Sequence, residues 1–438
     1  MKQVIGDLQQ EVKLLREQIE LLKNGRNSKT SSTPPSQDIG RSNQKNLRNP
    51  STRKPGGQPG HEGSTLEMKE HPDKIIEHRP DYCQLCGEKL DRNSGALVSR
   101  KQEIIIPPIL PQYIEHQSFG CTCQKCGHET ISAMPFYLQA NIQYGTEVNA
   151  YVSYFSVRQY LSYNRIVEMM RDVFNIPMSE GTVDNMLKGL AQKALPVYEQ
   201  IKQRVMQSPV IGGDETGVKI NGKKGWLFTF QTNQHTYLAV SFSRGFSTID
   251  SLFKNGFPVS VYITDCWAAQ LKTFAKAHQI CMAHLLRELN NFIDALNCQW
   301  AIEMKHLIQQ AIELKTRLTS DDYLHGNEKI KALESGLDIL LQTESETKHK
   351  KVKAFIKRLN KNRNAVFTFL YHPKVPPDNN ASERAIRTAK VKMKVSNQFK
   401  SLTGAQCFAV LRSVIDTTIK NSQNVFGALS NLAKLAAE

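Results

Sequence analysis

Two stretches of the chain decide its fold. Residues 209–242 read PVIGGDETGVKINGKKGWLFTFQTNQHTYLAVSF, and residues 257–269 read FPVSVYITDCWAA. In the first stretch, turn residues at Asn221-Gly222 and Asn233-Gln234 separate three apolar runs rich in β-branched and aromatic residues. This spacing predicts an antiparallel meander of three strands. The predicted strands cover 210–220, 225–231 and 236–242.

The second stretch extends this meander into an α/β fold. A helix is predicted at 248–253, and a further strand at 259–264 ends directly before Asp265. Three antiparallel strands, a helix and a strand that ends in an acid match the strand order of a ribonuclease-H-like core. In that core Asp214, on the first strand, lies beside Asp265.

The acids in these strands point to metal-ion chemistry. A buried, unpaired carboxylate is costly unless something compensates its charge, and a divalent cation is one such compensation. Two aspartates and a glutamate can hold two Mg²⁺ or Mn²⁺ ions about 4 Å apart for in-line phosphoryl transfer. Glu215 should point to the opposite face of its strand, so we exclude it from this site.

The third acid must come from another part of the chain. Residues 378–387 read DNNASERAIR, where Asp378 or Asn380 can cap a helix that carries Glu383 in its early turns. From spacing alone, an ion pair between Glu383 and Arg387 on a surface helix explains this glutamate equally well.

The charge balance narrows the class of partner. The 438 residues carry a net charge of +16, and residues 350–400 hold fourteen Lys and Arg against only Asp378 and Glu383. This excess suits a phosphate-binding surface, although a solvated lysine-rich helix face remains an alternative.

The sequence contains no run of about 18 apolar residues that would predict a membrane span, and no signal peptide is recognisable. We therefore expect a cytoplasmic, nucleoid-associated protein.

The N-terminal region is expected to mediate self-association. Residues 4–23 follow a heptad pattern, with β-branched residues at one core position and leucine at the other, which favours a parallel two-stranded coiled coil. An amphipathic helix packed on its own chain is the alternative. The coiled-coil helix is assigned to 1–24, and the Ser-, Asn- and Pro-rich residues 25–65 are expected to form a basic flexible linker.

The cysteine spacing predicts a structural zinc site. Five of nine cysteines lie between positions 83 and 126, in a chain without an export signal. Two Cys-x2-Cys pairs provide the four thiolates that a tetrahedral zinc site needs, whereas reduced free thiols are the alternative. Cys121, His116 and His128 compete as ligands. The expected set, in a module spanning 66–135, is Cys83, Cys86, Cys123 and Cys126.

Residues 136–207 are predicted to form a helical domain. Within it, 166–187 has the outline of a helix-turn-helix, with a turn at 175–178 and a second helix capped by Ser179. Such a pair either binds DNA or belongs to a plain helical bundle.

Taken in order, these motifs resemble one family over nearly the whole chain. The heptads, the RKPGGQPGH run at 53–61, the two cysteine pairs, the GDET strand at 213–216 and the DNNASERAIR motif are similar to those of transposases of the insertion sequence 66 family. The extra Cys121 departs from the family pattern, and residues 390–401 follow it only loosely.

The resemblance implies a DDE-type catalytic domain at 208–400, whose three acids are Asp214, Asp265 and Glu383. It also implies a mostly helical insertion at 282–377 within this domain. A C-terminal helical segment is expected after the domain, at 401–438. Cys281-x2-His284 would help to anchor the insertion, and Arg287 would face DNA. Without the resemblance, Cys281-x2-His284 is better explained as a strand end entering a helix, and Trp267 as a core residue.

The implied function is that of a transposase. It would bind double-stranded DNA at the element ends and the target, and would use Mg²⁺ or Mn²⁺ to cleave and join strands. A homodimer is expected, with accessory proteins of the same element as further partners. A catalytically inactive DNA-binding regulator and a structure-specific nuclease on the same core are alternatives. The expected phosphate contacts beside Glu383 are Arg384, Arg387, Lys390 and Lys392.

Overall fold

The computed structural model describes residues 11, 12, 14–16, 60, 63, 65–91, 93–135, 137–343 and 349–435. The predicted coiled coil and linker lie mostly outside these residues; within 4–23, only 11, 12 and 14–16 are described, and they are helical. The chain divides into two units, one of Arg41–Leu110 and one of Met1–Gly40 with Pro111–Glu438. Each unit is described by itself.

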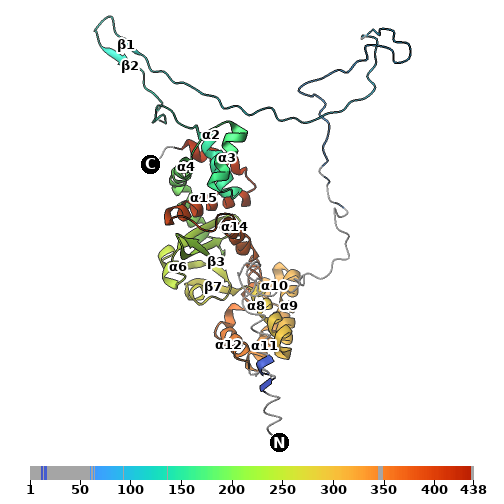
Figure 1. The fold of residues 1–438 in the computed structure, drawn as a ribbon. Coiled ribbons are helices and arrows are strands. Elements are labelled where there is room, and N and C mark those ends of the chain that lie inside the picture. The colour runs from blue at the N-terminus through green and yellow to red at the C-terminus, as the bar shows by residue number, and fades with distance from the viewer. Residues whose placement is uncertain are drawn as a thin grey trace. The chain divides into compact units, whose positions relative to one another are not determined.

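A five-stranded mixed sheet forms the centre of the larger unit (Figure 1). Its strand order is β5-β4-β3-β6-β7, where β3 to β5 form the predicted antiparallel meander and β6 and β7 run parallel to β3. This arrangement is compatible with a DDE-type core. The strands are β3 (Val210–Ile220), β4 (Lys223–Gln231), β5 (Thr236–Ser241), β6 (Phe257–Thr264) and β7 (Ala275–Ile280).

Local sequence explains both the hairpin and the close packing around β3. Asn221 and Gly222 both adopt positive φ angles, 45° and 75°, which a tight two-residue hairpin between β3 and β4 requires. Gly212 and Gly213 in β3 have no space for a side chain. A Cβ at Gly213 would collide with the Tyr262 hydroxyl, and one at Gly212 would collide with Asn379. The backbone of β3 therefore lies directly against β6 and against the residues that begin α14.

Helices that precede and follow the sheet in the sequence share one hydrophobic core with it. The predicted helix pair is present: α3 ends at Phe174, Asn175 adopts a left-handed conformation, and the Ser179 hydroxyl caps α4 by accepting from the Thr182 amide. The elements around this core are α2 (Thr146–Ser153), the π-helix η2 (Tyr154–Arg158), α3 (Tyr163–Phe174), α4 (Glu180–Lys193), α5 (Leu195–Met206), α6 (Phe246–Leu252), α7 (Ala268–Lys272), α15 (Leu402–Lys420) and α16 (Val425–Lys434).

The segment between β7 and the final part of the chain is helical (Figure 1). It packs around Trp300, Met304 and Phe355 in a second hydrophobic core, which also includes Val261 and Ile263 of β6. After it, α14 (Asn380–Ser396) returns to pack on β3 and β4. The insertion comprises α8 (Met282–Leu296), α9 (Gln299–Arg317), α10 (Ser320–His325), α11 (Glu328–Gln342), α12 (Lys350–Lys361), the 3-10 helix η3 (Arg363–Ala365) and α13 (Thr368–Tyr371).

Outside these elements, the larger unit also holds a short antiparallel hairpin of β1 (Gly120–Thr122) and β2 (Glu129–Ile131). In the smaller unit, an isolated bridge pairs Tyr82 with Lys89. Across the described part of the chain, no helix is both long and apolar enough to cross a membrane.

Candidate active site

Asp214 is a buried acid in the middle of β3. Only 8% of the residue is exposed, and its Oδ1 atom accepts a hydrogen bond from the Glu215 amide at 2.8 Å. Among the described residues, no ion pair reaches this carboxylate. Its negative charge is therefore taken out of water with little compensation from the protein.

Asp265 lies beside Asp214 because β3 and β6 run parallel in a fixed register. Gly212 of β3 is paired with Ile263 of β6. Asp214 and Asp265 each lie two residues further along the chain from this pair. Strand β6 ends at Thr264, and Cys266, with a φ angle of 71°, turns the chain directly after Asp265. The Trp267 amide donates to the Asp265 Oδ1 atom at 3.2 Å and orients the carboxylate.

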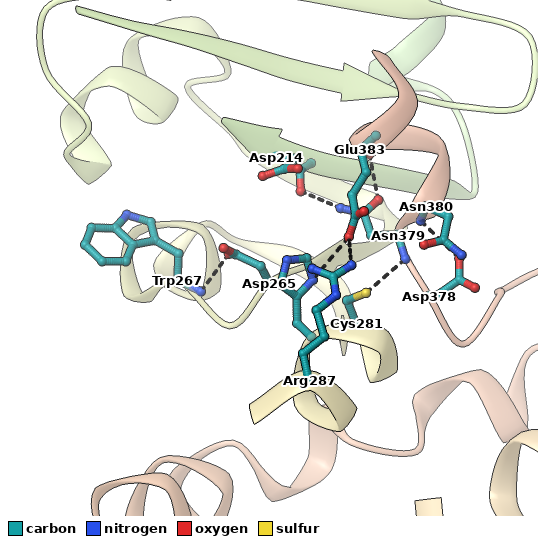
Figure 2. Close-up of polar contacts among 12 residues, drawn as sticks. Asp214, Asp265, Trp267, Cys281, Arg287, Asp378, Asn379, Asn380 and Glu383 are labelled. Carbon is teal, nitrogen blue, oxygen red and sulfur yellow. Dashed lines mark hydrogen bonds and ion pairs between the residues drawn. The ribbon is translucent and has the colours of Figure 1, made fainter. Parts of the chain in front are cut away.

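Glu383 lies in the first turn of α14, and Asn379 fixes the position of that turn. The Asn379 Nδ2 atom donates to the Gly213 carbonyl oxygen at 2.7 Å, and the Ser382 hydroxyl donates to Asn379 Oδ1 at 2.6 Å. The Asn379 amide also lies 3.1 Å from the Cys281 sulfur. Figure 2 shows how these contacts bring α14 close to β3 and to the start of α8.

Glu383 forms its ion pair with a residue of the insertion. Its carboxylate accepts from the Arg287 guanidinium (Figure 2). It also lies 3.8 Å from the His284 Nδ1 atom. The surface pairing of Glu383 with Arg387, which sequence spacing allows, is not the arrangement found. Cys281 and His284 lie where β7 enters α8, and the contact of the Cys281 sulfur with the Asn379 amide links this junction to the start of α14.

The electrostatics connect the three predicted acids. Burial raises the pKa of Asp214 well above its ordinary value, and the charges of Asp265, Glu215 and Glu383 raise it further. In the described segments, however, no three acidic, histidine or cysteine residues are grouped closely enough to hold a metal ion. The charges of Asp265 and Glu383 therefore act on Asp214, while the carboxylate of Glu383 is paired with Arg287.

The donor chemistry fits a hard divalent cation. Carboxylate oxygens are the ligands that Mg²⁺ and Mn²⁺ prefer. A cation here would also offset the repulsion that raises the pKa of Asp214. Asp214, Asp265 and Glu383 are the residues that would hold it.

Sequence reasoning missed a polar cluster around Glu215. This buried carboxylate pairs with the Arg244 guanidinium and accepts from Gln270 Nε2 at 2.5 Å. Burial and then the charge of Asp265 raise the pKa of Glu215 to about 7, while Arg244 opposes the shift. The Arg244 guanidinium also stacks 3.7 Å from the centre of the Trp267 ring. Trp267 is 38% exposed, so our expectation of a core residue was wrong.

The basic residues predicted beside Glu383 differ in their surroundings. Arg384 and Arg387 are exposed on α14. Lys390 is half-buried; burial lowers its pKa, and the nearby charges of Asp214 and Glu383 oppose that shift. Lys392 is buried and donates to the Leu161 carbonyl oxygen at 3.3 Å. Because its ammonium group contacts the α2–α3 region, we withdraw Lys392 as a phosphate contact.

The two Cys-x2-Cys pairs form the same local turn. In each, the first cysteine amide donates to the residue five positions later at 2.8 Å, and the first cysteine carbonyl accepts from a glycine with φ near 74°. Hydrogen bonds from the backbone and then from the second thiol lower the pKa of Cys83 and of Cys123. Cys121 lies outside the second turn, in β1.

Comparison with known proteins identifies one family. The family model described as "Transposase IS66 family" matches residues 141–407, more than half of the chain. The match spans the helix pair, the sheet, the insertion and α14. A search of curated proteins found no match.

Proposed function

This chain belongs to the IS66 family of transposases, and from that premise we propose that it cleaves the ends of its own element and joins them to target DNA. Asp214, Asp265 and Glu383 are the proposed catalytic acids. The observation that carries the proposal is the burial of Asp214 beside Asp265, with a pKa raised by both other acids.

The proposal assigns divalent metal ions to these acids. Two Mg²⁺ or Mn²⁺ ions would activate the attacking oxygen and stabilise the leaving oxygen of each phosphoryl transfer. Asp214 and Asp265 are fixed by strand register, and Asn379 keeps Glu383 near them. Arg287 neutralises Glu383 in the arrangement described, so Glu383 must exchange this partner to act as a ligand.

Side chains of α14 are the proposed contacts to the DNA backbone at the cleavage site. Arg384 and Arg387 are exposed in the turns directly after the glutamate, and Lys390 follows two turns after it. Arginine suits this role because its planar guanidinium binds phosphate oxygens in pairs. These contacts would orient the DNA without reading its sequence.

We further propose that the two cysteine turns bind structural zinc through Cys83, Cys86, Cys123 and Cys126. Support comes from the matched turn geometry and from the lowered pKa of Cys83 and Cys123, since zinc binds thiolates. The position of Cys121 in β1 favours Cys123 and Cys126 as the second pair. Dimerisation through residues 4–23 also stays a proposal, as does a requirement for accessory proteins.

The test is a product assay with the full-length protein, Mg²⁺ and labelled duplexes taken from the element's ends. Nicked ends together with joined end-target products support a transposase. Nicks without joined products would instead support a structure-specific nuclease. DNA binding with neither product would support a regulator and contradict the proposal.

A further inference from the structure

Helix α12 carries a row of exposed lysines on one side. The helix reads KKVKAFIKRLNK, and its buried residues Val352, Phe355 and Leu359 face the core of the insertion. At 3.6 residues per turn, four lysines fall on the opposite side of the helix, and all four are exposed. We call this row the α12 stripe; it consists of Lys350, Lys353, Lys357 and Lys361.

Among the described residues, no acidic side chain forms an ion pair with the α12 stripe. Helix α12 contains no acidic residue, and within the described segments no ion pair involves the four lysines. Elsewhere in the insertion the exposed charges are mixed, as in the pairs Arg317–Glu313 and Lys331–Glu328. A solvated helix face ordinarily mixes both signs of charge, so this segregation indicates an anionic partner.

Helix α8 connects the stripe's helix to the proposed active site. Two consecutive residues of α8 make this connection: Arg287 pairs with Glu383, and Glu288 pairs with Arg358 of α12 at 2.7 Å. Helix α12 is therefore held by Glu288, and the neighbouring residue, Arg287, pairs with Glu383, the third proposed catalytic acid. Through α8, the helix that carries the stripe is tied to the element that pairs with Glu383.

We infer that the α12 stripe binds the phosphate backbone of duplex DNA next to the cleavage site, irrespective of sequence. This inference rests on the proposed function, because it assumes that the acids act on DNA. The stripe spans eleven helical steps, or about 16 Å, along which a duplex presents one phosphate charge about every 1.7 Å. Lysine provides flexible point charges that suit backbone contact without base recognition.

The test measures how salt weakens the binding of the full-length protein to a labelled duplex of arbitrary sequence. Each lost phosphate contact lowers the slope of log K against log salt concentration by about 0.9. Changing all four stripe lysines to Gln should therefore lower the slope by about 3 to 4. Changing them to Arg should leave it unchanged. The matched control changes four other lysines of the insertion to Gln: Lys305, Lys329, Lys331 and Lys374.

Equal slopes for the stripe variant and the control would overturn the inference. The inference would also be overturned if the stripe variant lost binding to phosphatidylserine vesicles while the salt dependence of its DNA binding stayed unchanged. Unaltered circular dichroism and thermal unfolding would show that both variants are folded. The salt slope does not depend on catalysis, whereas a failure of the wild-type protein to cleave element ends would count against the proposed function alone.

Discussion

Asn379 donates a hydrogen bond from Nδ2 to the carbonyl oxygen of Gly213, 2.7 Å away. Gly213 directly precedes Asp214, and Asn379 lies four residues before Glu383. The bond therefore joins the elements that carry the first and third proposed acids. Ser382 completes the link by donating to Asn379 Oδ1, and all of these groups are buried.

Replacing Asn379 with Ala should lower both stability and cleavage. A buried acceptor left without its donor costs about 1–3 kcal/mol, and α14 loses its fixed position on β3. We expect a lower melting temperature and slower single-turnover cleavage, with little change in DNA affinity. Asn380→Ala is the matched control because that side chain is exposed. Identical behaviour of the two variants would argue against a positioning role for Asn379.

The metal-free protein should lose stability as the pH rises from about 5 to 8. The pKa of Glu215 in the folded state is about 7, above the ordinary value of 4.5, so its contribution is complete below 4.5 and is lost as the pH rises through 7. Asp214 acts in the same direction. The Glu215 part amounts to about 3 kcal/mol. Urea unfolding in EDTA should show the decline, and Glu215→Gln should flatten it; an equally steep decline in that variant would disprove the assignment.

Arg287→Ala should lower the Mg²⁺ concentration needed for half-maximal cleavage. Arg287 pairs with Glu383 and, in the proposed site, would compete with metal for it; its removal leaves the carboxylate available. Arg358→Ala removes the neighbouring pair with Glu288 and should leave the Mg²⁺ requirement nearly unchanged. A higher Mg²⁺ requirement in the Arg287 variant would show that this residue assists metal binding instead.

Zinc content should depend on the two cysteine turns and not on Cys121. Single Ser variants at Cys83 and Cys123 should each lose bound zinc in elemental analysis, because a tetrahedral site needs all four thiolates. Cys121→Ser should retain the zinc of the wild-type protein. Loss of zinc in the Cys121 variant, with full retention in the Cys123 variant, would reverse the ligand assignment.

Local pattern predicted much of the fold. Alternation and turn residues placed β3 to β6, and the Asn175 turn with the Ser179 cap placed α3 and α4, because these signals act within a few residues. The partner of Glu383 was not predictable in this way. Spacing within α14 suggested Arg387, whereas Arg287 is 96 residues away in sequence and meets Glu383 only through the tertiary fold. Burial of Lys392 likewise depends on packing against another helical segment.

The glutamate's place in the proposed site depends on that tertiary arrangement. The two aspartates follow from strand order and register, which sequence alone indicated. Glu383 was a candidate from the DNNASERAIR stretch that the family resemblance strengthened, and Asn379 supplies the physical link between its helix and β3. That link uses a buried side chain and a glycine carbonyl, a combination that no local periodicity reveals.

The most direct test of the three-acid site is single-turnover cleavage of an element end in Mg²⁺. Asp214→Asn, Asp265→Asn and Glu383→Gln should each reduce the rate by at least about 10³-fold while the protein still binds DNA. Asp378→Asn is the matched control: its carboxylate accepts from the Asn380 amide at the start of α14, and its rate should stay within about tenfold of the wild type. Near-wild-type cleavage by any one of the three acid variants would contradict the assignment.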